Sequence, residues 1–339
     1  MKLKFWMYLI IAAALVLSIG GCSSGSSDEL ENLAEITLDP PQRKPIDTSR
    51  TGVNAFVNDA AFGSIDAQFS EVKSTLNIDF VRVLFAWSDE VQPSPESTPN
   101  FSFYDDIASS IPSGVDALAV LTGLPAWMSA SANWLNGDAR ATFVELWVKP
   151  VMTRYAGRNR IKGWQIWNEP NQPNSNNELL QVANSPENYL EMLARAYDFS
   201  KSLNGKLVLN AATTAIAQNF PDTLNYNRDL ISMGVLDVCD IYAIHVYGKQ
   251  YENYVRDGGV IDTLSAVTKP MWITESGAQG AGAQRAYVEE VWPFLQERIP
   301  QIDRIYYYQF TENTPAATTY GLKSYSGVIS DLYTFLRDR

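Results

Sequence analysis

Two glutamates of this chain each end an apolar, aromatic run, and their carboxyl groups are the strongest candidates for chemistry. Glu169 follows the run that starts at Gly163, and Glu275 follows the run that starts at Pro270. Pro170 lacks a backbone donor and disfavours a helical conformation of the residue before it, so the first run must stop at Glu169. A pair of carboxyl groups can protonate a leaving oxygen and attack the carbon that it leaves, or activate a water. We therefore expect acid–base and nucleophilic chemistry at these two positions.

Polar and aromatic side chains stand near the ends of other apolar runs and could complete such a site. The polar candidates are Arg82, Asn168, His245 and Tyr247. The aromatic candidates are Trp127 and Tyr308, with Trp87, Trp167 and Phe310 as further rings near run ends. Two carboxyl groups, a few orienting polar groups and aromatic faces that stack on sugar rings suit the hydrolysis of a glycosidic bond. The positions of Trp127 and Tyr308 near the ends of apolar runs thus favour a substrate-binding role for both.

Each supporting residue also has a purely structural interpretation. Arg82 lies between two valines and could form a structural ion pair, because an unpaired buried charge is costly. His245 could be a hydrogen-bonded core histidine, and the aromatic rings could be ordinary core or rim packing. Cys239 is expected to be a small buried apolar residue. The sequence alone leaves these alternatives open.

Eight short apolar runs predict the strands of a parallel sheet. They start near Thr51, Asp79, Asp116, Gly163, Lys206, Asp240, Pro270 and Arg304. Successive starts lie 28–47 residues apart, which leaves room for a helix and two loops, as a parallel crossover requires. Eight strand–helix units predict an α/β fold, a single (β/α)8 TIM barrel. A doubly wound open sheet is the alternative, although the glycine-rich phosphate loops that mark many such sheets are absent.

Three stretches between these runs have helix signals. One helix should start with Ser185 as N-cap and Pro186 as first residue, and Gly205 should end it. Its apolar stripe is Leu190, Leu193 and Tyr197. The other two helices are expected from Gln284 to Arg298 and from Ser326 to Arg337. No shift of composition suggests a second domain after residue 48, so residues 48–339 are expected to form one catalytic barrel.

The N-terminus has the pattern of an export signal. Two lysines precede an apolar run from Phe5 to Ile19, which is too short for a comfortable membrane span and is typical of a secretory signal. The run is followed by Gly20-Gly21-Cys22, and this ending resembles the bacterial lipobox. The resemblance implies a signal peptide over residues 1–21 and lipidation of Cys22. An ordinary cleaved signal is the alternative.

Residues 22–47 are rich in serine, acidic residues and proline and lack an apolar period, so they are expected to form a flexible tether from the lipidated Cys22. We expect an exported bacterial lipoprotein of the cell envelope. Ser23, rather than aspartate, follows the cysteine, and the lipobox resemblance then favours the outer membrane in a cell with two membranes.

Composition excludes several other classes of protein. The formal net charge is -12, which argues against nucleic acid as a partner and against attachment to an anionic membrane by charge; such a surface mainly favours solubility. The chain has one histidine and two distant cysteines, which rules out a disulfide framework and a His-rich metal site. We expect no metal and no cofactor, and a monomer.

The two glutamate motifs resemble a known clan. The segment Trp-Gln-Ile-Trp-Asn-Glu-Pro-Asn around Glu169 and the segment Trp-Ile-Thr-Glu-Ser-Gly around Glu275 are similar to clan A of the retaining glycoside hydrolases, which are (β/α)8 barrels. The first segment, with Leu-Pro-Ala-Trp-Met at residues 124–128, is most similar to glycoside hydrolase family 39. The His-x-Tyr sequence at His245 and Tyr247 makes family 5 the second choice. The resemblance covers about residues 48–339.

This resemblance implies roles residue by residue. Glu169 matches the acid/base, which must hold a proton when the bond breaks and be ionised when water attacks. Glu275 matches the nucleophile, which Arg82 would keep ionised and to which Tyr247 would donate a hydrogen bond. Asn168 matches the residue that binds the sugar 2-hydroxyl. From the sixth strand, His245 would orient the site.

The chain departs from the clan at the eighth strand. The clan usually offers a tryptophan there as the floor of the −1 sugar site, whereas this chain has Tyr306-Tyr307-Tyr308-Gln309-Phe310. The identity of the −1 sugar is therefore open, as are the linkage and endo or exo action.

The resemblance and the residues together predict a retaining glycoside hydrolase that cleaves O-glycosidic, β linkages of a poly- or oligosaccharide, with an exopolysaccharide at the cell surface as one substrate. The alternatives are a transglycosylase with the same carboxylates, a catalytically silent carbohydrate-binding lipoprotein, and a purely structural envelope protein. If the mechanism is retaining, the two carboxyl groups should lie about 5–5.5 Å apart.

Overall fold

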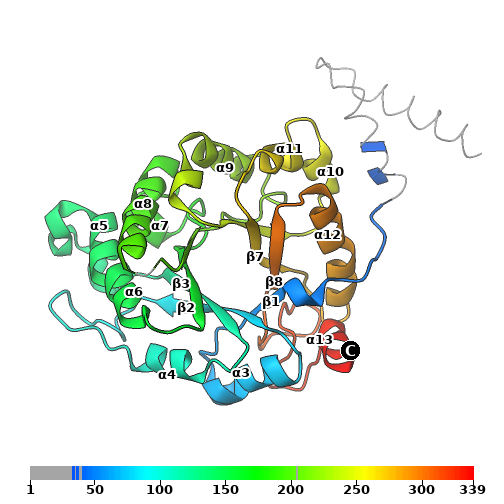
Figure 1. Cartoon of the computed structure of the whole chain (residues 1–339), viewed down its shortest axis with the longest axis horizontal. Helices are drawn as coiled ribbons and strands as arrows, with labels where there is room; N and C mark the ends of the chain where they lie inside the picture. The colour runs from blue at the N-terminus through cyan, green and yellow to red at the C-terminus, as the bar shows by residue number, and fades with distance from the viewer. Residues whose placement is uncertain (1–32, 35, 38–39, 204) are drawn as a thin grey trace, which may run out of the picture.

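A computed structural model describes residues 33–34, 36–37, 40–203 and 205–339. Eight strands in these residues form one parallel sheet that curls into a ring, with the helices outside it (Figure 1). The strands are β1 Thr51–Asn54, β2 Phe80–Ala86, β3 Asp116–Thr122, β4 Ile161–Ile166, β5 Leu207–Asn210, β6 Tyr242–Tyr247, β7 Met271–Gly277 and β8 Ile302–Tyr307. The expected eight strands are thus confirmed.

The connections between the strands are helical. The α-helices are α3 Ile65–Ser74, α4 Ser102–Ser110, α5 Ala139–Phe143, α6 Lys149–Tyr155, α7 Ser175–Leu179, α8 Pro186–Leu203, α9 Asp222–Ser232, α10 Tyr251–Val255, α11 Val260–Ser265, α12 Gln284–Arg298 and α13 Asp331–Asp338. Short 3₁₀ helices are η1 Thr48–Arg50, η2 Ala60–Phe62, η3 Ala126–Ser129, η4 Ser131–Asn133, η5 Leu135–Gly137 and η7 Val235–Val238. The segment η6 Val144–Val148, between α5 and α6, is a short π-helix.

The sheet closes on itself, which distinguishes it from a doubly wound open sheet. The order is β5-β4-β3-β2-β1-β8-β7-β6, so the first strand pairs in parallel with both β2 and β8. Among the described residues, β5 and β6 are joined by one isolated parallel bridge, Leu209 to Ile241. The fold is a single (β/α)8 TIM barrel, and the C-terminal ends of all eight strands meet at one face.

Two of the three expected helices are confirmed at their predicted starts. Ser185 accepts a hydrogen bond from the backbone N–H of Asn188 at the start of α8, and Gly205 follows that helix with φ +68°. The helix α12 has the predicted bounds. The prediction of a helix from Ser326 was wrong, because α13 begins only at Asp331 with Ser330 as its N-cap. Gly327 has φ +91° and Ile329 forms an antiparallel bridge with Lys323, so the chain turns back there before it can start a helix.

The barrel interior is apolar at one end and polar at the other. The lower layer is formed by Leu118, Leu209, Ala243, Trp272 and Tyr306. Above it, Arg82, Gln165 and Asn54 are buried and joined by hydrogen bonds: Arg82 Nε donates to Gln165 Oε1 at 2.8 Å and Nη1 to Asn54 Oδ1 at 2.7 Å. Buried polar groups are costly unless paired, so this layer is a polar floor under the C-terminal face.

The described part of the predicted tether contacts the barrel. Asp47 caps η1 at the predicted start of the barrel domain. Before it, the backbone N–H of Lys44 donates to the carbonyl of Glu289 on α12, and the Arg43 side chain pairs with the Glu289 carboxylate. The predicted signal peptide and Cys22 lie outside the described residues. In the described part of the chain, no helix is long and apolar enough to cross a membrane.

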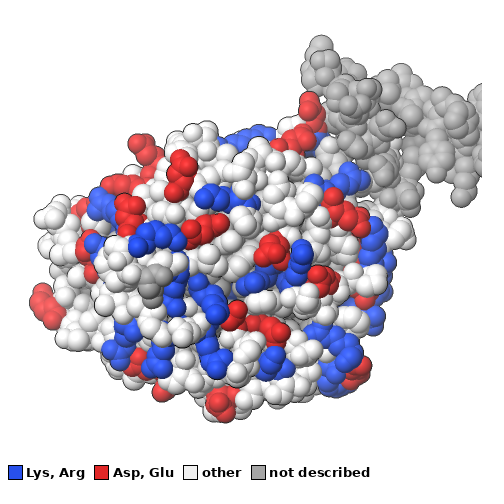
Figure 2. Space-filling view, in the orientation of Figure 1, with Lys and Arg blue, Asp and Glu red and all other residues white. Residues whose placement is uncertain are grey.

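The surface charges are mixed in sign. On the face shown in Figure 2, lysine and arginine side chains alternate with acidic ones, and neither sign gathers into one broad patch. The solubilising role of the acidic composition stays a prediction.

Candidate active site

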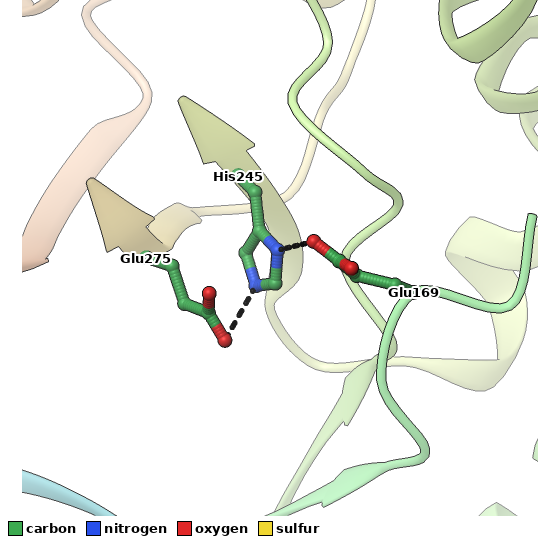
Figure 3. Close-up of side chains that lie close together, drawn as sticks. All are labelled: Glu169, His245 and Glu275. Carbon is green, nitrogen blue, oxygen red and sulfur yellow. Dashed lines mark hydrogen bonds and ion pairs between the residues drawn. The ribbon is translucent and has the colours of Figure 1, made fainter. Parts of the chain in front are cut away.

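The two candidate glutamates meet at the C-terminal face with the single histidine between them. Glu169 follows β4, His245 lies on β6 and Glu275 lies on β7, and Figure 3 shows the imidazole between the two carboxyl groups. Nδ1 of His245 is 3.1 Å from Oε1 of Glu169, and Nε2 is 3.6 Å from Oε1 of Glu275. One oxygen of each carboxyl group and the imidazole lie within 4.8 Å of one another. The carboxyl groups are therefore near neighbours facing one space.

A β-bulge on β7 turns Glu275 into the site. Ile273 pairs with Ile244, but Glu275, not Thr274, pairs with His245. Thr274 accepts a hydrogen bond from Gln165 inside the barrel, whereas the Ser276 hydroxyl accepts one from Trp292 of α12 outside it. Side chains of a regular strand alternate between faces, so an inward Thr274 would leave Glu275 outward. The extra residue lets both point inward, which is a known use of a bulge.

A strained turn after β4 delivers Asn168 and Glu169 together. Trp167 has φ +76° and Glu169 has φ +44°, in the left-handed region that side chains with a Cβ rarely adopt. Such residues cost about 1–3 kcal/mol each and persist only where the surroundings hold them. The indole of Trp167 is buried against Phe143 at 5.0 Å, so its side chain leaves the inner face. The next two side chains then both reach the site.

Arg82 is fully buried and supplies the positive charge of the site. Its Nη1 donates to Glu275 Oε1 at 2.6 Å, and its Nη2 donates to Asn168 Oδ1 at 2.7 Å. The structural ion pair considered for Arg82 and the contact with the candidate nucleophile are thus the same interaction. Through Gln165 and Asn54 the guanidinium is also tied to the polar floor, which fixes where it holds the carboxylate.

The environment of Glu275 keeps it ionised. Burial raises the pKa of its carboxyl group, but the imidazole of His245, the charge of Arg82 and a hydrogen bond from Tyr247 together hold that pKa below its ordinary value. Tyr247 Oη donates to Oε2 at 2.8 Å. Burial and the charge of Glu275 raise the pKa of the Tyr247 hydroxyl, so this group stays a donor. An ionised carboxylate is the form that a nucleophile needs.

The Tyr247→Phe variant is expected to lose about 10–100-fold in kcat/KM, the equivalent of one hydrogen bond to a charged group. Without that donor the pKa of Glu275 rises. Since activity needs the carboxylate and is lost as pH falls through its pKa, the acidic limb of the pH profile should move to higher pH. The check is kcat/KM against pH. Tyr333→Phe is the matched control, because it removes a tyrosine–glutamate bond, to Glu71, on another part of the molecule. An unshifted limb in Tyr247→Phe contradicts the expectation.

Tyr308 lies directly after β8, and its ring contacts that of Tyr247, which binds Glu275. It is half-buried, and burial, with the charges of Glu275 and Glu312 adding to it, raises the pKa of its hydroxyl to about 12. Its ring meets those of Tyr247 and Tyr320 edge-on at 6.1 and 6.0 Å, and Tyr247 and Tyr320 meet at 5.6 Å. Three tyrosine rings thus form one wall of the site where the clan has a tryptophan.

Trp127 lies in a different aromatic group. Its ring meets Trp87 edge-on at 5.1 Å, and its Nε1 donates to the carbonyl of Gln92 at 2.8 Å. Trp87 is buried and stacks in turn on Trp147. The structure therefore places Trp127 after β3, half-buried at the edge of a buried aromatic cluster, without a hydrogen bond to either glutamate among the described residues. Its substrate-binding role stays a prediction.

Two further residues of the site were missed by the sequence analysis. Tyr320 comes from the loop after β8, and the Glu312 carboxylate orders that loop by accepting from the backbone N–H groups of Tyr320 and Gly321. Asn177, buried on α7, bonds to the backbone of Glu169. Their only sequence signals are a lone aromatic and a lone amide in irregular loops. Cys239 is buried as expected, and burial raises the pKa of its thiol.

The three central side chains also have the ligand types of a metal site. Glu169, His245 and Glu275 each offer one atom within 4.8 Å of the others. However, Oε1 of Glu275 already accepts from the buried Arg82 guanidinium at 2.6 Å. A cation bound there would lie beside another buried positive charge, which opposes its binding. The donor set fits a charge-balanced pair of carboxyl groups better than a metal.

The geometry supports two states of Glu169. When it is ionised, it can only accept, and an Nδ1–H of His245 would donate to it; when it is protonated, its hydroxyl can donate to Nδ1. The contact at 3.1 Å serves both states. Beside it stands a carboxylate that Arg82 and Tyr247 keep charged. Such a pair can move a proton at one atom and attack at another.

Comparison with known proteins points in the same direction. Residues 143–333 match the model of the family described as "glycosyl hydrolase catalytic core", a span that includes both glutamates. A search of curated proteins gave no significant match.

Solved structures share the fold at low sequence identity. A family 39 glycoside hydrolase from Bacteroides cellulosilyticus WH2 is 17% identical with a TM-score of 0.61, over 87% of this chain and 63% of that one. A GH39 β-xylosidase from Caulobacter crescentus is 13% identical with a TM-score of 0.61, over 88% and 72% of the two chains. A GH5_18 protein from Bifidobacterium longum is 16% identical with a TM-score of 0.57, over 85% and 77%. This chain thus spans less than two thirds of the first of these structures.

Proposed function

This chain belongs to the glycosyl hydrolase catalytic core family, and from that premise we propose that it is a retaining glycosidase that cleaves O-glycosidic bonds by double displacement. The observation that carries the proposal is the placement of Glu169 and Glu275 across one imidazole, with carboxyl oxygens within 4.8 Å. Inverting enzymes keep their carboxyl groups about 6.5–9.5 Å apart to admit a water, and retaining ones about 5–5.5 Å. The short separation favours direct attack by one of the two groups.

In the first step Glu275 attacks the anomeric carbon. The carboxylate oxygen forms a bond to that carbon, the bond to the leaving oxygen breaks, and Glu169 gives its proton to that oxygen. The products are a glycosyl ester on Glu275 and a free alcohol. Glu275 suits this part because Arg82 and Tyr247 lower its pKa and so keep it ionised.

In the second step a water completes the reaction. Glu169, now ionised, takes a proton from the water, whose oxygen attacks the anomeric carbon as the ester bond to Glu275 breaks. Two inversions give net retention. Asn168 is proposed to bind the sugar 2-hydroxyl, and its amide carbonyl is already held by Arg82 at 2.7 Å, which leaves its amide nitrogen to donate. His245 holds Glu169 in place from β6.

A pocket that reaches the tyrosine wall through Phe56 supports a substrate longer than one sugar. The β1–β2 pocket has a volume of about 340 Å³ and lies between the loops after these strands. Its aromatic side chains are Phe56, Phe103 and Tyr104, and its polar ones include Asn58, Ser88 and Asn100. Phe56 meets the ring of Tyr308 at 5.9 Å, which connects the pocket with the tyrosine wall. Glu90 adds a carboxyl group to the lining, and aromatic faces with such polar groups suit the hydroxyl groups of a sugar.

We also propose a β-linked poly- or oligosaccharide as substrate and the cell envelope as the location. The names of similar structures include a β-xylosidase, a β-glucosidase and a family 10 endo-β-1,4-xylanase, which supports the β linkage. The lipobox-like sequence at Cys22 supports anchoring by a lipid. An enzyme tied there would meet polysaccharides of the cell surface.

A panel of aryl β- and α-glycosides and of β-linked polysaccharides tests the proposed function. The wild type is expected to release the aglycone from at least one β-glycoside, and Glu275→Gln to be inactive on the same substrate. A wild type that cleaves no glycoside, or a variant as active as the wild type, contradicts the proposal. Product chromatography separates hydrolysis from transfer to a sugar acceptor.

A further inference from the structure

We propose that Asn177 is a positioning residue for Glu169: its side-chain amide holds the strained turn that aims the acid/base carboxyl at the leaving oxygen. The proposal rests on the function proposed above. Asn177 lies on α7, is fully buried, and has not been assigned a part by the sequence motifs or by the comparisons.

The amide of Asn177 uses all its main hydrogen-bonding groups on one turn. Its Nδ2 donates to the carbonyl of Glu169 at 2.8 Å and to the carbonyl of Gln172 at 2.7 Å. Its Oδ1 accepts from Nε1 of Trp167 at 2.7 Å. The side chain thus connects the residue before the Asn168–Glu169 pair, the acid/base itself and the end of the turn. The backbone N–H of Asn177 donates to Oδ1 of Asn174, the N-cap of α7, and this bond fixes Asn177 within the helix.

The turn needs such a connection because its conformation is unfavourable. Trp167 and Glu169 have positive φ although neither is glycine. Backbone of this kind relaxes unless several contacts hold it. The other backbone contacts of Glu169 are its own N–H to Ala212 and the N–H of Gln172 to its carbonyl. Asn177 thus bonds directly to both positive-φ residues of the turn, to the indole of Trp167 and to the backbone carbonyl of Glu169.

Loss of this connection should affect acid catalysis more than nucleophilic attack. Glu275 is held from β2 and β6 by Arg82 and Tyr247, and neither of them contacts Asn177. Asn168 belongs to the same turn, but its side chain is held by Arg82 and not by Asn177. Displacement of Glu169 would therefore weaken proton donation while leaving the nucleophile in place. A leaving group that departs as a stable anion needs no proton, whereas a poor leaving group does. The effect of Asn177 should depend on the leaving group.

The test compares a 2,4-dinitrophenyl and a 4-methylphenyl glycoside of the sugar that the full-length wild type cleaves fastest. In Asn177→Ala we expect kcat/KM to fall about 10–100-fold for the 4-methylphenyl substrate, within the usual range of general acid catalysis, and less than about threefold for the dinitrophenyl one. In a Glu169→Gln background the same change should have no further effect. Equal losses on both substrates, or an additive loss in that background, overturn the proposal.

Asn171→Ala is the matched control. Asn171 is an amide of the same loop whose Oδ1 accepts from the backbone of Thr214 and whose Nδ2 donates to the hydroxyls of Thr214 and Thr223. It makes no bond to Trp167 or to the carbonyl of Glu169 among the described residues, so its loss should change both substrates alike. Asn177→Ser keeps a small polar group and serves where Asn177→Ala does not fold.

A second measurement does not require turnover. The chain has one histidine, so the imidazole ¹⁵N signals of the full-length protein come from His245 alone. Nδ1 contacts Glu169, and its signal should move in Asn177→Ala or Asn177→Ser toward its position in Glu169→Gln. A signal that stays at the wild-type position overturns the proposal. If the wild type cleaves no glycoside, the proposed function is wrong. The NMR measurement still tests whether Asn177 positions Glu169, because it needs no activity.

Discussion

The Glu275→Ala variant is expected to lose at least about 10⁴-fold in kcat/KM, the scale at which removing a catalytic nucleophile acts. The loss follows from the geometry, because Glu275 is the carboxylate that Arg82 and Tyr247 hold charged in the barrel. Added azide should restore part of the turnover by occupying the space of the lost carboxylate. Its single attack on the anomeric carbon gives a glycosyl azide of the opposite configuration, which NMR identifies.

The same substitution leaves Arg82 without its partner. Arg82 is fully buried, and breaking a buried pair costs about 3–5 kcal/mol, so urea denaturation of the variant must accompany the kinetics. Glu275→Gln keeps the size and the hydrogen-bonding oxygen, and it should be as inactive but more stable. A folded Glu275→Ala with more than about a tenth of wild-type activity is incompatible with the assignment of the nucleophile.

The Glu169→Ala variant should have a different profile. General acid–base catalysis contributes about 10²–10⁴-fold, so kcat/KM on a 4-methylphenyl glycoside should fall by that factor. On a 2,4-dinitrophenyl glycoside, kcat/KM should change little, because the leaving group needs no proton. The kcat on that substrate should fall, since hydrolysis of the glycosyl ester on Glu275 then proceeds without a general base and limits the rate.

Azide distinguishes the two glutamates. In Glu169→Ala it needs no base to attack the ester, so it should raise kcat and give a glycosyl azide of the same configuration as the substrate. The product of Glu275→Ala has the opposite configuration. The same azide anomer from both variants contradicts the two roles. Glu178→Ala, at an exposed glutamate of α7, is the control for loss of an acid near the site.

The sequence predicts the barrel well because its signals are local. Each strand is a short apolar run, and the spacing of the runs leaves only parallel crossovers. Parallel strands all end at one face of the barrel. The predicted strands alone, without any helix, therefore place five side chains in one site: Arg82, Glu169, His245, Tyr247 and Glu275. The structure has the expected contacts of Arg82 and Tyr247 with Glu275.

The details that aim these side chains depend on contacts between distant segments. Alternation along β7 would put Thr274 and Glu275 on opposite faces, and the bulge that reverses this is visible only in the pairing with β6. The positive φ of Trp167 and of Glu169 breaks the usual preferences of these residue types, and it is held by Asn177. Local patterns do not encode such strain.

The loops are the least predictable part of the fold. Because they shape the substrate cleft, the substrate is equally hard to predict. Tyr320 joins Tyr247 and Tyr308 because Glu312 folds its loop back, and the start of α13 was misjudged in the same region. Trp127 is predicted beside the substrate from its position after β3, and its contacts with Trp87 and Gln92 neither require nor exclude that role. An aromatic residue after a strand can line a cleft or pack beneath it, and only the tertiary contacts decide.

The most direct test of the central claim is the configuration of the first product. Proton NMR of the anomeric signals, recorded in the first minutes after wild-type protein is added to a β-glycoside, separates the product from later mutarotation. Two displacements at carboxyl groups as close as Glu169 and Glu275 predict that the β anomer forms first. If the α anomer forms first, a single displacement by water has occurred, and the account of Glu275 as a covalent nucleophile is wrong.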